Sequence, residues 1–105
     1  KDDMMILNGI NIFPADIESV LEKHPDVRAA AALPLASAVH GQIPVAAVQL
    51  EAGAQITVQQ LQHYAREHLA IRAPRRIIVL DVLPRNHQGK LLRKQIKQYF
   101  KRCEI

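Results

Sequence analysis

Two short apolar runs open the chain, MMIL at residues 4–7 and INIF at residues 10–13, and the dipeptide Asn8-Gly9 separates them. Asn-Gly between apolar runs is a strong signal for a β-hairpin, because both residues tolerate the positive φ angles of a two-residue turn. We therefore predict a hairpin over residues 4–13.

Apolar residues recur at helical spacing in three later segments. The first begins at Pro14, a residue suited to the first turn of a helix, and ends before Pro25. The second follows Thr57, which forms a potential capping box with Gln60. The third is predicted to begin near Lys90. The apolar positions of these helices are Ile17, Val20, Leu21 and His24 in the first, Val58, Leu61, Ala65, His68 and Leu69 in the second, and Leu92, Ile96, Tyr99 and Phe100 in the third.

Three short apolar runs, at residues 27–33, 43–50 and 76–80, are typical of strands. The alanine run at 29–32 is also compatible with a helix. The segment 35–42, LASAVHGQ, is predicted to be a loop. The resulting order of hairpin, helix, strand, strand, helix, strand and helix predicts an α+β domain: a small three-stranded sheet with flanking helices plus an N-terminal β-hairpin.

The length of 105 residues indicates one domain.

The positive charge of the chain is concentrated in its C-terminal third. The whole chain carries a net charge of +4. Between Ala70 and Cys103 there are ten Lys or Arg residues and one acid, Asp81, which gives +9 there and −5 elsewhere. Such a segment is suited to nucleic acid, a small anion or an acidic partner. The few aromatic residues form no basic stacking platform, so nucleic acid is disfavoured and a basic binding module stays open.

Cysteine use and hydropathy indicate the compartment. A single cysteine, Cys103, excludes a disulfide within one chain and favours the reducing cytoplasm. No apolar run approaches the roughly 18 residues of a membrane span, so none is predicted. The first residues, KDDMMILNG, contain acids where a signal peptide is basic. Because the chain begins with Lys1 rather than Met, we interpret it as part of a longer protein.

Gly89-Lys90 is the main candidate for chemistry in this sequence. A phosphate-binding P-loop would need a glycine where Pro84 stands and a serine or threonine where Leu91 stands, so that motif is excluded. The five histidines show no metal-binding spacing, so no metal site is predicted, and His68 is predicted to be a core residue. A lysine at a helix start costs stability, which raises the question of a specific role, but the residues alone favour an ordinary solvated lysine.

Several segments in the right order resemble one enzyme family. LPRNHQGKLLRKQI (residues 83–96) resembles the closing motif of the adenylate-forming enzymes, which include acyl- and aryl-CoA ligases, luciferases and the adenylation domains of peptide synthetases. Residues 1–27 resemble the family's hinge and the loop after it, and residues 39–50 and 69–85 resemble two of its strands. The resemblance covers only the C-terminal domain of these enzymes. It implies that residues 1–105 form the mobile C-terminal lid domain.

The family reaction has two halves, and the resemblance assigns residues to each. A carboxylate first attacks the α-phosphate of ATP, and a thiol then displaces AMP after the small domain has rotated. The resemblance implies that Lys90 is the catalytic lysine of adenylation and that Gly9 lies at the channel for the thiol-bearing pantetheine arm. It further implies that Asp2 is the hinge and that Gly89 and Arg85 support the loop of the lysine.

The resemblance also implies substrates and partners. ATP and AMP, CoA or phosphopantetheine, and Mg²⁺ are expected in the enzyme's N-terminal domain, and this fragment alone is expected to bind none of them and to be inactive. The expected partners are that N-terminal adenylation domain and a carboxylic acid substrate, without nucleic acid. The predicted function is an AMP-forming acyl- or aryl-CoA ligase. The alternatives are an adenylation domain that loads a carrier protein and a non-catalytic basic binding module.

Overall fold

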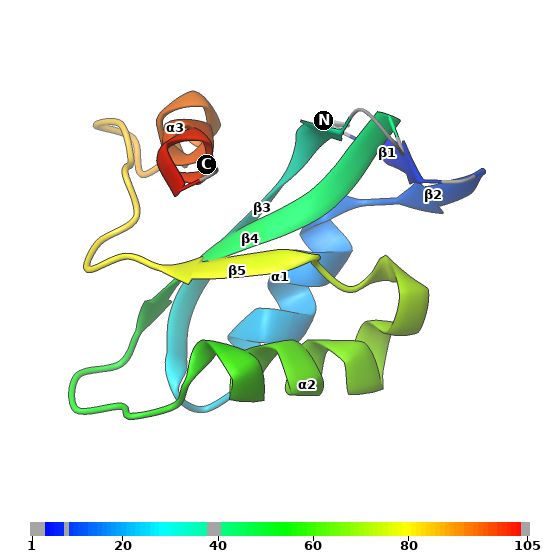
Figure 1. Cartoon of the computed structure of the whole chain (residues 1–105). Helices are drawn as coiled ribbons and strands as arrows, with labels where there is room; N and C mark the ends of the chain where they lie inside the picture. The colour runs from blue at the N-terminus through cyan, green and yellow to red at the C-terminus, as the bar shows by residue number, and fades with distance from the viewer. Residues whose placement is uncertain (1–3, 8, 38–40, 104–105) are drawn as a thin grey trace.

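The helices and strands follow one another in the order that the sequence predicts, with one added 3₁₀ turn (Figure 1). The structure, a computed structural model, describes residues 4–7, 9–37 and 41–103. The elements are β1 (Met5–Leu7), β2 (Ile10–Ile12), α1 (Pro14–Glu22), β3 (Val27–Ser37), β4 (Gly41–Leu50), α2 (Val58–Leu69), the 3₁₀ turn η1 (Ala70–Arg72), β5 (Arg76–Val79) and α3 (Arg93–Cys103).

The strand β4 is the centre of a three-stranded sheet with the order β3-β4-β5. It pairs antiparallel with β3 and parallel with β5. The strands β1 and β2 form a separate antiparallel hairpin, in which Ile6 lies opposite Asn11. The predicted α+β fold, with its small sheet, flanking helices and N-terminal hairpin, is therefore confirmed.

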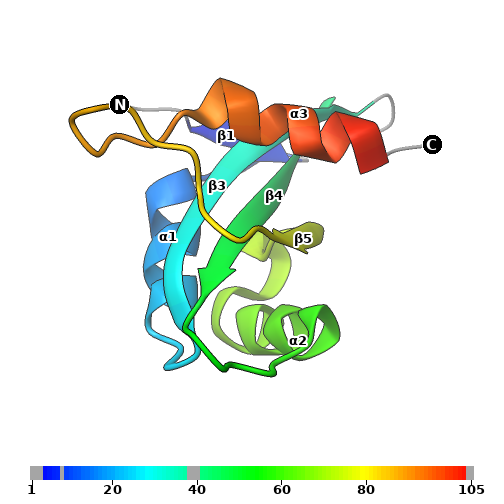
Figure 2. The same ribbon diagram turned by 90° about the vertical axis from the view of Figure 1, so that its left-hand side faces the viewer.

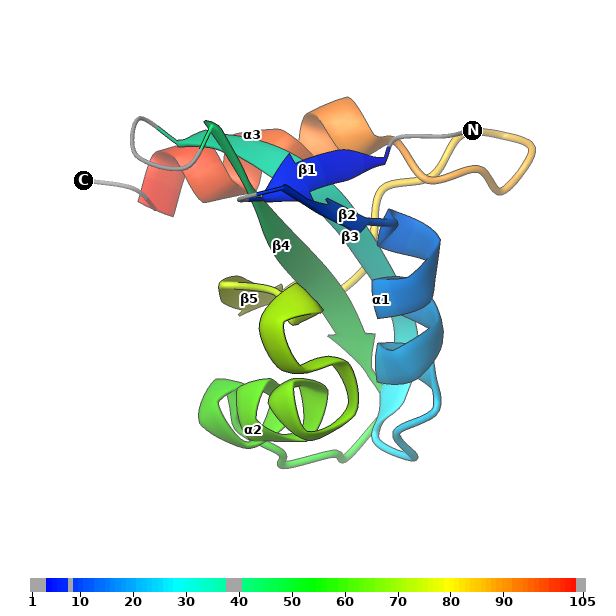
Figure 3. The same ribbon diagram turned by 90° about the vertical axis from the view of Figure 1, so that its right-hand side faces the viewer.

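Apolar side chains cover both faces of this sheet. Residues of β3 and β4 alternate between a cluster with α1, α2 and the hairpin and a second cluster with α3. Figures 1 and 2 show α3 across the sheet from α1 and α2, and Figure 3 shows the hairpin on the side of α1 and α2. Because both faces are buried, these strands have unbroken apolar runs in the sequence. The ambiguous alanine run at 29–32 is a strand whose small side chains let helices approach closely.

The loop predicted for residues 35–42 is wrong, because the strands extend through most of it. β3 continues to Ser37 and β4 begins at Gly41, with Ser37 opposite Gly41. Two prolines that face each other, Pro34 and Pro44, lie within the paired strands. Proline lacks an N–H, but it removes no bond at a position where the backbone N–H points away from the partner strand.

The helix α2 has the predicted cap and, except for His68, the predicted apolar stripe. Thr57 Oγ1 accepts from the Gln60 N–H at 3.1 Å, and Gln60 Oε1 accepts from the Thr57 N–H at 2.9 Å. His68, predicted to be a core residue, is exposed, and its Nδ1 lies 2.9 Å from the Tyr64 carbonyl oxygen. Ala65 is buried, whereas His68, one turn later, lies at the edge of the buried face of α2.

Candidate functional site

The segment from Pro84 to Leu92 folds back on itself just before α3. The Leu92 N–H donates to the Pro84 carbonyl oxygen at 3.0 Å, and Arg85 and Leu91 form an isolated antiparallel bridge. Lys90 lies in this loop and is exposed. It does not begin the last helix, as the sequence suggested, because α3 begins three residues later. The cations at the unfavourable start of α3 are therefore Arg93 and Lys94, and not Lys90.

Asn86 holds the backbone of Lys90 from both sides. Its side-chain Oδ1 accepts from the N–H groups of Gln88 and Lys90, each at 2.9 Å. Its own N–H donates to the Lys90 carbonyl oxygen at 2.9 Å. Sequence reasoning missed this residue, although asparagine commonly bonds the backbone two or more positions later in turns.

Gly89 and Arg85, the predicted supports of the loop, contact each other. Gly89 has φ +84°, a left-handed conformation that glycine adopts without strain. Its carbonyl oxygen accepts from Arg85 Nη1 at 2.9 Å. The structure thus brings Arg85, Gly89 and Lys90 together in one compact loop.

Both ends of the loop are attached to the body of the domain. Before the loop, Leu83 is buried with α3, and its N–H donates to Gln49 Oε1 on β4 at 3.2 Å. After the loop, Arg93 Nε donates to the Ala32 carbonyl oxygen on β3 at 3.2 Å, and Arg93 Nη2 pairs with Glu18 on α1. The loop is therefore exposed but anchored.

Gly9, predicted for the pantetheine channel, lies in the turn of the hairpin. It is exposed and has φ +83°, with no atom within 4 Å of the place where a Cβ would stand. Figure 1 shows the hairpin and the loop before α3 on opposite sides of the molecule. The structure therefore does not bring Gly9 and Lys90 together. Asp2, the predicted hinge, lies outside the described residues.

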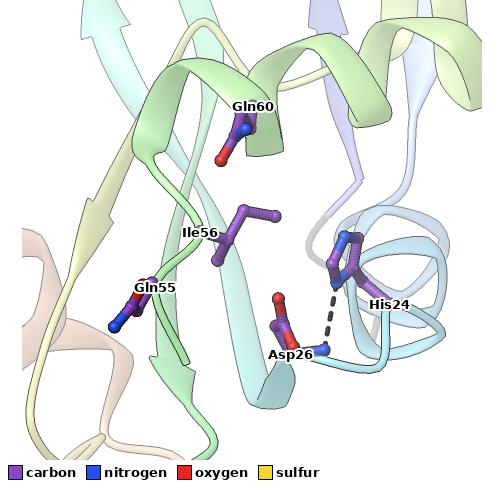
Figure 4. A pocket seen from close by; sticks show the side chains of 5 residues that line it. All are labelled: His24, Asp26, Gln55, Ile56 and Gln60. Carbon is purple, nitrogen blue, oxygen red and sulfur yellow. Dashed lines mark hydrogen bonds between the residues drawn. The ribbon is translucent and has the colours of Figure 1, made fainter. Parts of the chain in front are cut away.

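A depression of about 390 Å³ lies between the end of α1 and the start of α2 (Figure 4). Its lining residues are His24, Asp26, Gln55, Ile56 and Gln60. The Asp26 N–H donates to His24 Nδ1 at 3.0 Å, so the neutral imidazole carries its proton on Nε2. None of the loop residues lines this depression, and its side chains have no arrangement of nucleophile and base.

Residues 4–7, 9–37 and 41–103 contain neither a metal-binding cluster nor a helix that could span a membrane. Within them no group of three or more His, Cys, Asp or Glu residues is placed to hold a metal ion. No helix in that part of the chain has the length and apolar character needed to cross a membrane.

Comparison with known proteins identifies the family. The model of the family described as AMP-binding enzyme C-terminal domain matches residues 16–90, which include the loop up to Lys90. The chain belongs to this family. The resemblance read from the sequence motifs is thus confirmed.

Curated and solved relatives agree with the family. The chain is 39% identical over 105 residues to a 2-succinylbenzoate–CoA ligase of Geobacillus kaustophilus, which covers 99% of this chain and 21% of that protein. Among solved structures it resembles the amide bond synthetase McbA of Marinactinospora thermotolerans, with a TM-score of 0.87, 31% identity and coverage of 94% and 20% of the two chains. It also resembles the o-succinylbenzoate CoA synthetase MenE of Bacillus subtilis, solved with the acyl-adenylate OSB-AMP, with a TM-score of 0.81, 40% identity and coverage of 90% and 19%. The chain spans about a fifth of the length of these relatives.

The asparagine of this AMP-binding C-terminal domain offers a test of the loop geometry. In Asn86→Ala the amides of Gln88 and Lys90 lose their shared acceptor, at a local cost of about 1 kcal/mol. We expect these two amides to exchange with solvent about fivefold faster, as hydrogen exchange measured by NMR would show. Asn86→Asp is the matched control because it keeps the acceptor oxygen. Equal exchange in the alanine variant and the unchanged chain would contradict the assigned contacts.

Proposed function

We propose that this chain is the mobile C-terminal domain of an AMP-forming acyl- or aryl-CoA ligase, and that Lys90 serves its adenylation step. The observation that carries the proposal is an exposed lysine in an anchored loop, in a chain of the AMP-binding enzyme C-terminal family. The curated relative named above is a 2-succinylbenzoate–CoA ligase, which favours an aromatic carboxylic acid as substrate and CoA as acceptor.

The chemistry of adenylation explains why a lysine is suited to this place. The substrate carboxylate must approach the α-phosphate of ATP, so two anions come together and charge builds on the phosphorus oxygens. An ammonium group on a flexible four-carbon stem can interact with both anions and stabilise the developing charge. Asn86 holds the backbone of Lys90 by hydrogen bonds, so the loop would lose little conformational entropy when it enters the adenylation site.

The second half-reaction needs the other side of the domain. We assign the approach of the pantetheine arm to the hairpin turn at Gly9, which has open space around it and no side chain to obstruct a slender ligand. The hairpin and the lysine loop lie on opposite sides of the molecule (Figure 1), which suits a domain that rotates between the two half-reactions. Asp2, outside the described residues, is the hinge in this proposal.

The remaining parts of the enzyme belong to its N-terminal adenylation domain. That domain is the main partner of this chain, and it would bind ATP and Mg²⁺ and form the pocket for the carboxylic acid. The enzyme would work in the cytoplasm. An acceptor thiol on a carrier protein, in place of CoA, would use the same hairpin.

The proposal is tested by comparing this chain with the full-length enzyme. ATP–pyrophosphate exchange is measured for both with a panel of aromatic and aliphatic carboxylic acids that includes 2-succinylbenzoate. We expect the full-length enzyme to exchange pyrophosphate only with a fitting acid, and we expect no exchange by residues 1–105 alone. Exchange catalysed by the isolated chain, or salt-sensitive nucleic acid binding by an enzyme that fails to exchange with any acid, would overturn the proposal.

A further inference from the structure

Two cations occupy the start of α3, where the electrostatics are unfavourable. Arg93 and Lys94 begin this helix, and its first turn holds no acid. The partial positive charge of a helix N-terminus disfavours cations within that turn. Lys94 is exposed to solvent, but Arg93 is only partly exposed. A partly buried arginine at this position needs a compensating partner.

The partner of Arg93 is a carboxylate on another helix. Glu18 Oε2 of α1 accepts from Arg93 Nη2, and the same oxygen accepts from the Ala32 N–H at 2.8 Å. Arg93 Nε donates to the Ala32 carbonyl oxygen at 3.2 Å. The three residues therefore close a ring of hydrogen bonds, which we call the Arg93 clamp.

Ala32 lies on the edge strand β3, where its backbone can bond to residues from both faces of the sheet. β3 is an edge strand of the sheet, and both backbone groups of Ala32 point away from β4, toward this edge. The α3 cluster and the α1 cluster lie on opposite faces of the sheet. The clamp thus joins the start of α3 to α1 around the edge of β3.

The ion pair of the clamp is less exposed to solvent than an ordinary surface ion pair. The side chain of Glu18 is 16% exposed and that of Arg93 is 35% exposed, whereas Arg28 and Glu51 pair at 3.5 Å with 64% and 45% exposure. Exposed pairs contribute little, and a guanidinium fork held by two acceptors also fixes geometry.

From this placement we infer that Arg93 is a positioning residue for Lys90, acting through the clamp with Glu18 and Ala32. Arg93 lies three residues after Lys90, and it holds the downstream end of the loop as buried Leu83 holds the upstream end. Losing the clamp frees that downstream end and lets the lysine drift from its working position. The inference rests on the proposed role of Lys90 in adenylation.

The test compares both half-reactions in the full-length enzyme. We expect Arg93→Ala to lower the kcat of adenylation about tenfold, with the KM values for ATP and the acid nearly unchanged, because misplacing a catalytic group slows the chemical step. Thioester formation from supplied acyl-adenylate should stay within about twofold. Arg28→Ala is the matched control, since it removes the arginine of the exposed ion pair between Arg28 on β3 and Glu51, and both rates should stay unchanged.

A double variant separates positioning from general damage. Adding Arg93→Ala to Lys90→Ala should cause no further loss of adenylation, because Arg93 acts only through the lysine. Additive losses, or equal losses in both half-reactions, would overturn the clamp inference. If Arg93→Ala does not fold, Arg93→Lys decides: it keeps the stem and the charge but lacks the fork, and unchanged adenylation in it would likewise overturn the inference. Normal adenylation in Lys90→Ala would instead overturn the proposed function.

Discussion

Lys90→Ala in the full-length enzyme is expected to lower the rate of acyl-adenylate formation by about 10²–10³-fold, or roughly 3–4 kcal/mol of transition-state stabilisation. In the proposed role of Lys90, the ammonium group balances charge that builds only as the two anions react, so its loss should slow this step. Thioester formation from supplied acyl-adenylate should be largely preserved. Rapid-quench measurement of both half-reactions gives the two rates.

The melting temperature of this variant separates catalysis from folding. Lys90 is exposed, and its backbone bonds to Asn86 do not need its side chain, so stability should change by less than about 0.5 kcal/mol. Lys94→Ala is the matched control, because it removes another exposed lysine four residues away, and it should leave both half-reactions unchanged. Normal adenylation by Lys90→Ala would show that Lys90 is an ordinary solvated lysine.

Gly9→Leu should produce the opposite pattern. We expect normal acyl-adenylate formation and a loss on the order of 10²-fold in thioester formation, since a branched side chain at the hairpin turn would block or misplace the pantetheine arm. The positive φ of Gly9 adds a stability cost of roughly 1–2 kcal/mol, so the melting temperature should fall. Product formation with CoA from supplied acyl-adenylate measures the effect.

Gly53→Leu is the control for that backbone strain. Gly53 has φ +82° and equally open surroundings, but it lies in the turn between β4 and α2. It should therefore lower the melting temperature by a similar amount and leave thioester formation intact. Equal losses of thioester formation in the two leucine variants would show that strain, rather than an obstructed channel, explains the effect at Gly9.

Local signals in the sequence were sufficient for most of the fold. The Asn-Gly signal and the Thr57 capping signal each act over a few residues; β1 and β2 lie on either side of the first, and α2 begins after the second. The alanine run and the segment 35–42 were harder to predict. They are strands because β3 and β4 pair with each other, and their local sequence preference does not indicate this.

The candidate site was predictable only in part for the same reason. The Gly89-Lys90 motif is contiguous, so it directed attention to Lys90, although this exposed lysine lies in the loop before α3 and not at the helix start. The contact of Arg93 with Glu18 spans 75 residues, and no sequence pattern connects a helix-start arginine with a carboxylate on α1. His68 lies at one edge of the apolar stripe of α2, and the sequence pattern alone does not decide whether an edge position is covered.

In the proposed function, one small domain serves two half-reactions from opposite sides. The direct measurement is the ratio of the adenylation rate to the rate of thioester formation from supplied acyl-adenylate, determined side by side for Lys90→Ala and Gly9→Leu. We expect the ratio to fall by about 10²–10³-fold in Lys90→Ala and to rise by about 10²-fold in Gly9→Leu. A ratio that stays constant, or that moves in the same direction in both variants, would contradict the proposed function.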